Sequence, residues 1–209
     1  RRLNIACALV HKPKLLILYY SMSGTNYQLA SWAKDEAEKL GSEVKLVKVP
    51  ELAPKAVIDS VPSWKAFTEK TAHIPEAHLD DLAWADAYLF SVPTRFGNMA
   101  SQMKQFIDTA GGPWSKGVMA NKAVSAMSSA QNAHGGQEAT ILSLYTTMYH
   151  WRSIVVAPGY LDPSVGKAGG NPYGTSVSVD QEGKMVEDVE DAVRYQTRRT
   201  LEVAEKLMK

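Results

Sequence analysis

The sequence predicts an α/β fold in which helices cover both faces of a parallel sheet. Residues 15–20 (LLILYY) and 87–92 (AYLFSV) are almost continuously apolar, which is typical of strands that are buried on both faces. Each run leads through a short turn into a segment whose apolar residues recur at three- and four-residue steps, the spacing of an amphipathic helix. Alternating strands and helices predict parallel strands joined by right-handed crossovers.

The same patterns place the elements along the chain. The predicted strands are residues 15–20, 43–49, 87–92, 122–129 and 154–157, and residues 177–179 are expected to extend the sheet edge. The predicted helices are residues 29–40, a segment carrying Met103, Phe106 and Ile107, residues 137–150 and a terminal helix over 189–208 whose inward residues include Leu207. Residues 50–78 carry four prolines and predict an irregular excursion with a short helix near 64–70, and residues 165–175 predict a Gly-rich insertion.

Composition narrows the class of protein. A chain of 209 residues, 45% hydrophobic and 22% charged, is long enough for one globular domain with a sizeable core. The net charge of +1 gives no sign of nucleic-acid binding or of a basic membrane anchor. The single cysteine, Cys7, excludes an intrachain disulfide and a cysteine-cluster metal site. We expect a cytoplasmic protein with no metal, an N-terminal extension over residues 1–13 and one domain over 14–209.

Three polar turns follow three of the predicted strands, at residues 21–26, 93–99 and 130–136. Because the carboxyl ends of parallel strands share one edge of the sheet, these turns are expected to converge on one ligand crevice. The first turn enters a helix, whose unpaired N–H groups and dipole favour an anion, and the hydroxyls of Ser21, Ser23 and Thr25 add donors. No Lys or Arg lies between Ser21 and Leu29, so the donors there would be neutral. A plain helix cap explains the same residues.

The turn sequences YYSMSGTN, PTRFGNM and SSAQNAHGGQE resemble the FMN-binding loops of flavodoxin-like proteins. More narrowly, together with GGPW (111–114) and GGNPYG (169–174), they resemble the WrbA family of NAD(P)H:quinone oxidoreductases, from Lys14 to the end of the chain. The resemblance implies a flavodoxin-like, doubly wound, five-stranded parallel sheet in the order 2-1-3-4-5. It also implies FMN as cofactor, NADH or NADPH as electron donor, a quinone as acceptor, and a homotetramer whose sites borrow residues from neighbouring subunits.

The resemblance also implies roles for particular positions. The FMN phosphate would be held by Ser21, Met22, Ser23, Gly24, Thr25 and Asn26. The isoalloxazine ring would lie beside Pro93, Thr94, Arg95, Phe96, Gly97 and Asn98, with Ser129, Ala130, Gln131, Asn132 and Gly135 on its other flank. Trp114 and His150 would border the pocket where nicotinamide and quinone stack, His150 also touching the cofactor. Trp114, His150 and Arg95 are the expected catalytic residues, Arg95 by stabilising negative charge near the reduced ring.

Each of these residues also has a simpler explanation. Arginine is usually an exposed surface residue, and Arg95 can be one as well. Trp114 can pack on a neighbouring loop, and His150 can complement a helix dipole. Two departures from the family pattern stand out. The third loop is one residue longer, and His150 is followed by Trp151 where the family often has a second histidine.

The expected activity is FMN-dependent two-electron reduction of quinones to hydroquinones by ping-pong hydride transfer from NADH or NADPH. Two alternatives stay open. A flavodoxin-type one-electron carrier usually has an acidic docking surface, whereas this chain is almost neutral. The other is a non-catalytic accessory that binds a repressor or DNA; direct DNA binding predicts clustered Lys and Arg, and no such basic stripe is evident. The preferred nucleotide and the physiological quinone do not follow from the sequence.

Overall fold

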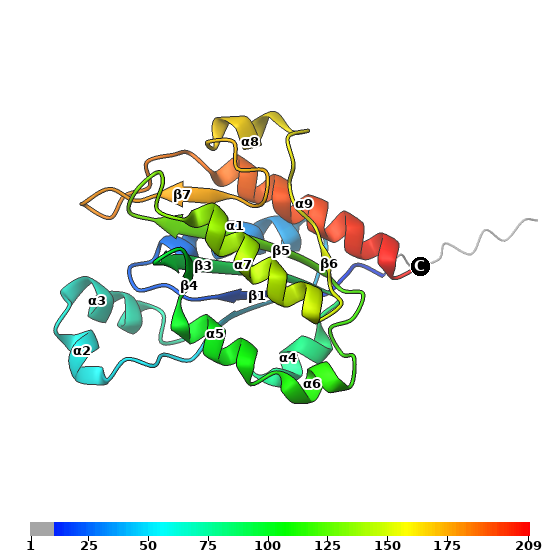
Figure 1. The fold of residues 1–209 in the computed structure, drawn as a ribbon, viewed down its shortest axis with the longest axis horizontal. Coiled ribbons are helices and arrows are strands. Elements are labelled where there is room, and N and C mark those ends of the chain that lie inside the picture. The colour runs from blue at the N-terminus through cyan, green and yellow to red at the C-terminus, as the bar shows by residue number, and fades with distance from the viewer. Residues whose placement is uncertain (1–10) are drawn as a thin grey trace, which may run out of the picture.

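The computed structural model describes residues 11–209, which form a central sheet with helices on both faces (Figure 1). The main strands are β1 (Leu15–Tyr19), β2 (Val44–Lys48), β3 (Ala87–Arg95), β5 (Ala123–Ala130) and β6 (Ile154–Val155), in the spatial order β2-β1-β3-β5-β6. All neighbouring pairs along this path are parallel. The expected class and strand order are confirmed, because this path is the predicted 2-1-3-4-5 order.

The expected number of five strands is wrong, because the sheet has seven. One addition is β4 (Asn98–Met99), which returns antiparallel to the end of β3. The other is β7 (Ser176–Ser178), which pairs with the last three residues of β5, whereas β6 pairs with the first two. The fifth sheet position is therefore shared by two short strands, and the intervening residues 156–175 carry α8 (Pro163–Lys167).

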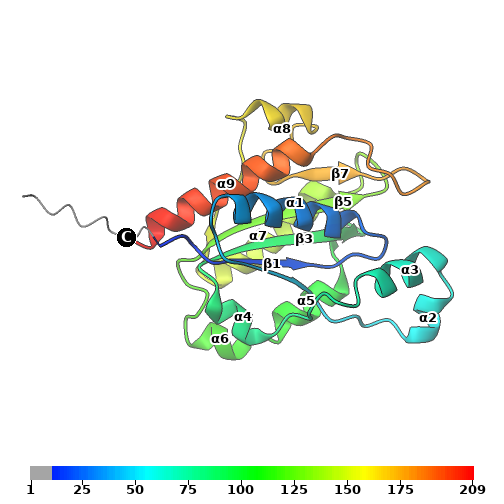
Figure 2. The same ribbon diagram turned by 180° about the vertical axis from the view of Figure 1, so that it is seen from behind.

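The two faces of the sheet are covered by different helices (Figure 2). Helices α1 (Thr25–Lys39) and α9 (Glu190–Leu207) lie together on the face that receives Leu15 and Ile17. Helices α5 (Ser101–Asp108) and α7 (Gln137–His150) cover the face that receives Leu16 and Leu18. Since successive side chains of a strand point to opposite faces, burial on both sides requires the continuous apolar run of β1.

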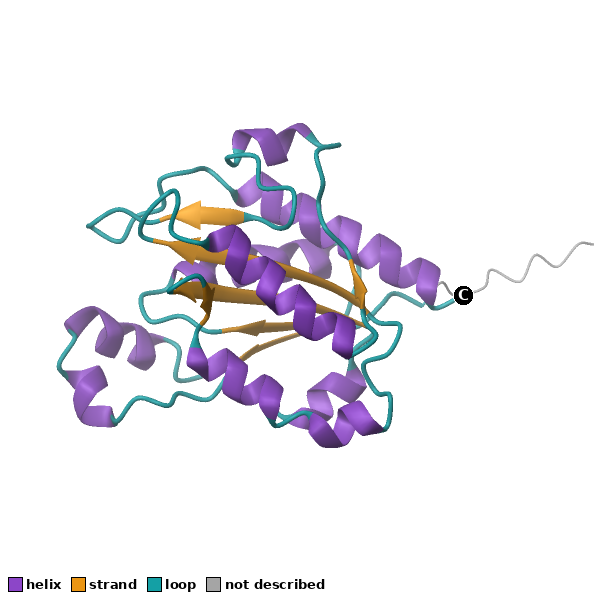
Figure 3. Ribbon diagram, in the orientation of Figure 1, coloured by secondary structure: helices purple, strands orange, loops and turns teal. Residues whose placement is uncertain are grey.

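The remaining helices lie at the ends of the sheet (Figure 3). They are α2 (Lys55–Asp59), α3 (Pro62–Lys70), α4 (Leu79–Trp84) and α6 (Gly111–Ser115). Helix α3 confirms the short helix expected near 64–70, and Pro62 starts it because proline lacks only an N–H that the first turn leaves unpaired anyway. Leu207, expected to point inward, is 43% exposed because it ends the last turn of α9.

The expected N-terminal extension falls largely on residues 1–10, which lie outside the described residues. Lys12 forms an ion pair with Glu205 of α9 at 3.6 Å, so the chain enters the sheet beside the C-terminal helix. Among residues 11–209, no helix combines the length and the apolar composition that crossing a bilayer requires.

Candidate functional site

The first predicted turn lies between β1 and α1 and is shaped by two of its own residues. Gly24 adopts φ 107°, a left-handed conformation that favours glycine, and caps α1. Its N–H donates to Ser21 Oγ at 2.9 Å, so Ser21 closes the turn. Within residues 11–209, the backbone N–H groups of Thr25, Asn26 and Tyr27 have no hydrogen-bond acceptor. No acidic residue occupies the first turn of α1, so this arrangement suits an anion such as a phosphate.

Asn26 has a structural task that its position in the turn did not reveal. Its side chain is 1% exposed, donates to Ser91 Oγ at 3.2 Å and accepts from Ser129 Oγ at 2.6 Å. The Ser91 hydroxyl in turn donates to the Asn26 backbone oxygen at 2.8 Å. Both polar atoms of the Asn26 side chain are therefore hydrogen-bonded within the protein. Its backbone N–H is the group that is available to a ligand.

The second turn forms a tight hairpin between β3 and β4. Arg95 pairs with Asn98, and the two residues between them, Phe96 and Gly97, have φ of 52° and 78°. Two positive φ values in succession are the geometry of a type I′ hairpin. A phenylalanine rarely adopts this conformation, and here it leaves the ring fully exposed at the tip. Pro93, before the hairpin, is buried.

Arg95 and Thr94 connect this hairpin to its neighbours. The Arg95 guanidinium contacts Met22 Sδ at 2.8 Å through Nη2 and donates to the Thr94 carbonyl oxygen at 3.1 Å through Nη1. Thr94 Oγ1 lies 2.6 Å from Thr140 Oγ1 on α7. Arg95 thus spans the first and second turns while remaining exposed.

The third turn packs directly on the hairpin. A Cβ on Gly136 would lie 2.9 Å from the Cα of Gly97, a separation that permits only glycine. Gly136, at φ 99°, caps α7. Ser129 is buried, whereas Ala130 and Gly135 are half-buried and Gln131 and Asn132 are exposed. The three turns therefore converge, as the positions of the strand ends predicted.

Two cavities flank the converged turns. The larger, of about 920 Å³, is lined by Met22, Arg95, Phe96 and Asn98 together with Tyr20, Gln102, Leu52 and Trp64. The smaller, of about 430 Å³, is lined by Ser23, Gly24 and Thr25 together with residues of α3. Leu52, Trp64 and the α3 residues belong to the irregular excursion over 50–78. No motif or spacing in that segment indicated that it would face the site.

A buried polar network in the wall of the larger cavity also escaped the sequence analysis. Tyr20 Oη donates to Glu51 Oε2 at 3.0 Å, and Gln102 Nε2 donates to both Tyr20 Oη at 2.8 Å and Glu51 Oε1 at 2.7 Å. Burial, and then the neighbouring Glu51 charge, raise the pKa of the Tyr20 phenol well above its usual value. The phenol therefore stays protonated and donates. Glu51 Oε1 also accepts from the N–H groups of Leu52 and Ala53, at 2.8 and 3.0 Å, which fixes the start of the excursion against the cavity.

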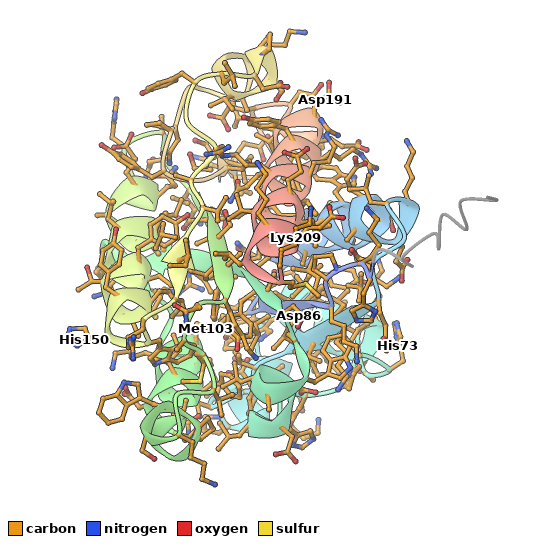
Figure 4. The ribbon with its side chains drawn as sticks, turned by 90° about the vertical axis from the view of Figure 1, so that its right-hand side faces the viewer. His73, Asp86, Met103, His150, Asp191 and Lys209 are labelled. Atoms are coloured by element: carbon orange, nitrogen blue, oxygen red, sulfur yellow. The ribbon has the colours of Figure 1, made fainter. Side chains whose placement is uncertain are left out.

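Trp114 and His150 lie at the opposite end of the sheet. Helix α7 starts beside the third turn and runs 14 residues back to His150, a distance of about 20 Å. Trp114 Nε1 donates to the His150 carbonyl oxygen at 2.8 Å, which places both residues together. Figure 4 shows His150 at the edge of the molecule. Within one chain, Trp114 and His150 therefore lie away from Arg95 and the three turns, because α6 and the end of α7 are at the other end of the sheet.

Among residues 11–209, no group of three or more His, Cys, Asp or Glu side chains has the arrangement of a metal site.

His150 occupies the last turn of α7, where a cation complements the helix dipole. The position of His150 therefore also agrees with a purely structural role at the end of this helix.

Comparison with known proteins identifies the family of the chain. Residues 13–164 match the family described as NADPH-dependent FMN reductase. A Deinococcus radiodurans protein named NAD(P)H dehydrogenase (quinone) is 48% identical over 195 residues, 93% of this chain and 97% of that protein. A protein of the same name from Geotalea daltonii is 39% identical over 202 residues, 93% and 98% of the two chains.

Solved structures show the same fold at lower identity. A flavodoxin, WrbA-like protein from Agrobacterium tumefaciens superposes with a TM-score of 0.60 at 20% identity, covering 93% of this chain and 98% of that one. Flavodoxin 1 from Bacillus cereus gives a TM-score of 0.57 at 13% identity, covering 90% and 97%. The chain belongs to the NADPH-dependent FMN reductase family, as a flavodoxin-like member whose relatives are named NAD(P)H dehydrogenase (quinone).

Proposed function

We propose that this chain catalyses FMN-dependent two-electron reduction of quinones to hydroquinones, with NADH or NADPH as the electron donor. The observation that carries the proposal is the convergence of three turns on an unpaired helix N-terminus beside an open cavity of about 920 Å³, in a chain of this family. The chemistry supplied by bound FMN is the relay of a hydride from the nicotinamide to the quinone, in two half-reactions of a ping-pong cycle.

The first turn is the phosphate end of this site. Ser21 Oγ accepts a hydrogen bond from the Gly24 N–H, which closes the turn. The free N–H groups of Thr25 and Asn26 lie at the positive end of α1, where they would donate to the anion. Ser23, which is exposed, and Thr25 add hydroxyl donors, and Met22 lines the cavity beside them. Residues 14–209 would thus act as one FMN-binding domain.

The second and third turns are the ring end. In this proposal the isoalloxazine ring would lie between the second and third turns. The residues that would contact it are Pro93, Thr94, Gly97 and Asn98 on one side and Ser129, Ala130, Gln131, Asn132 and Gly135 on the other; of these, Asn98 lines the larger cavity. Arg95 holds a positive charge at the cavity, where it would stabilise an anionic form of bound FMN. The exposed Phe96 ring offers an aromatic face to a planar substrate.

Trp114 and His150 act in this proposal on the flavin of a neighbouring copy. The support is their position about one α7 length from the turns, together with a Trp114 side chain that is 53% exposed. A homotetramer would bring the Trp114 loop of one subunit to the cavity of another. Small molecules are the proposed partners, rather than nucleic acid or membrane, because the net charge is only +1. We place the enzyme in the cytoplasm, in line with its single cysteine.

The test is an assay of the purified, FMN-loaded chain with NADH or NADPH and benzoquinone, followed by nicotinamide absorbance. Oxidation that requires both FMN and quinone supports the proposal and ranks the two nucleotides. Bound FMN that gives a stable one-electron radical without nucleotide oxidation would instead establish a flavodoxin-type carrier. Absence of FMN binding would remove the proposed cofactor itself.

A further inference from the structure

Helix α3 packs directly on the first turn (residues 21–26), the proposed phosphate turn, although about 40 residues separate them in the sequence. The Phe67 ring carbons Cδ2 and Cε2 lie 3.5 Å from the position that a Cβ would take on Gly24. The same ring meets Tyr27 edge-on with centroids 5.8 Å apart, and Tyr27 lies 5.3 Å from Tyr19 in β1. This aromatic chain fixes α3 relative to the turn.

One face of α3 looks into the cavity of about 430 Å³ at the turn. Ser63, Ala66, Phe67 and Lys70 all line it, and their i, i+3, i+4 and i+7 spacing places them on one side of a helix. The opposite rim is Ser23, Gly24 and Thr25. The cavity therefore joins the proposed phosphate turn to a helix face that ends in a lysine.

Lys70 is the one charged side chain among the described residues that line this cavity. No carboxylate within residues 11–209 pairs with its ammonium group within 4.0 Å. The turn itself contains no Lys or Arg from Ser21 to Leu29. The unpaired cation thus faces a site whose own donors are all neutral.

We propose that Lys70, with the Ser63 hydroxyl on the same face, supplies the positive charge for the FMN phosphate and so selects FMN over riboflavin. This inference rests on the proposed function, because it assigns the anion of that site. A phosphate dianion gains Coulomb energy from a nearby ammonium group. Since Lys70 is exposed, salt screens the attraction, and the contribution to affinity is moderate and depends on ionic strength.

The experiment compares flavin binding to the cofactor-free chain, measured by quenching of flavin fluorescence with FMN and with riboflavin. The variants are Lys70→Met, Lys70→Glu and a matched control, Lys65→Met. Lys65 lies on the same helix but not at the cavity. Lys70→Met is expected to raise the Kd for FMN about three- to tenfold at low salt and to leave the Kd for riboflavin unchanged. Lys70→Glu is expected to weaken FMN binding further, and the control not at all.

High salt should reduce the difference between the wild type and Lys70→Met for FMN. The inference is overturned if Lys70→Met matches Lys65→Met, or if FMN and riboflavin lose affinity equally. Riboflavin binding also reports that the variant is folded. A wild-type chain that binds no FMN would contradict the proposed function, which is a different result from normal FMN binding by Lys70→Met.

Discussion

The Ser129 hydroxyl donates to the Asn26 side-chain oxygen at 2.6 Å, joining two residues that are 103 positions apart in the sequence. Ser129 is the next-to-last residue of β5, and Asn26 lies in the first turn of α1. Ser91 of β3 completes the connection through the other end of the Asn26 amide. The first turn and the third turn are therefore fixed to each other by buried groups, which lowers the ordering cost of binding a ligand there.

Asn26→Ala should destabilise the chain and loosen the site together. The change removes both side-chain hydrogen bonds and leaves the buried Ser129 hydroxyl without its acceptor, which costs about 1–3 kcal/mol. Urea unfolding measures the loss, and flavin binding should weaken in parallel. Gln181→Ala, at an exposed position, is the control. An unfolding free energy equal to that of the control would show that the network does not stabilise the turns.

Arg95→Ala should lower quinone reduction far more than stability. Arg95 is exposed, and within residues 11–209 its guanidinium donates hydrogen bonds only to Met22 Sδ and the Thr94 carbonyl oxygen. The unfolding free energy should therefore change by less than about 0.5 kcal/mol. Loss of its charge beside the flavin should reduce kcat/KM about tenfold. Steady-state kinetics with benzoquinone measure this. Lys104→Ala removes another cation from the same cavity, and an equal loss there would refute a specific role for Arg95.

Trp114→Ala should reduce kcat/KM about tenfold while leaving the Kd for FMN unchanged, because the phosphate turn is at the other end of the sheet. Trp114→Phe keeps an aromatic face and loses only the hydrogen bond to the His150 oxygen, so it should retain most activity. A purely structural Trp114 would give the reverse pattern, with lower thermal stability in both variants and normal turnover.

Mixing the Arg95→Ala and Trp114→Ala chains under exchanging conditions tests the sharing of sites between subunits. Mixed assemblies should contain some sites with both residues intact, so part of the activity should return. Activity that stays at the average of the two variants would show that both residues act in the site of their own chain.

Tyr145 should make the fold sensitive to alkaline pH. Burial raises the pKa of Tyr145 from 10.0 to about 12, while its hydroxyl donates to the Tyr173 oxygen at 2.7 Å and accepts from the Ala126 N–H at 3.1 Å. Below pH 10 the full contribution is present, because both states keep the proton. Between about pH 10 and 12 the unfolded chain releases it first, so stability falls by about 1.4 kcal/mol per pH unit.

Urea unfolding from pH 8 to 12 measures this slope. Tyr145→Phe should cost about 1–2 kcal/mol at pH 8 and show a shallower fall above pH 10. Tyr160→Phe, at a residue that is 71% exposed, is the matched control and should keep the wild-type slope. An identical slope in Tyr145→Phe would contradict the assignment.

The sequence predicted the strands well where burial on both faces leaves a local signature. The run over 15–20 is apolar throughout and the run over 87–92 is apolar except at Ser91, because their side chains are buried on both faces of the sheet. The fifth strand was harder. Residues 154–157 and 177–179 each carry a short strand pattern, but only their pairing with opposite ends of β5 shows that they share one sheet position.

By themselves, the hydrophobic period and the turn chemistry of the sequence determined the fold class and the three turns that meet at one edge, because both are local properties. The strand order came from the resemblance to flavodoxin-like proteins. Tertiary structure alone decided that Lys70 of α3 lines a cavity with the first turn, that Glu51 ties the excursion to Tyr20, and that Trp114 lies a helix length from Arg95. These outcomes depend on which surfaces pack against each other across long stretches of chain. The local spacing of residues does not predict this packing.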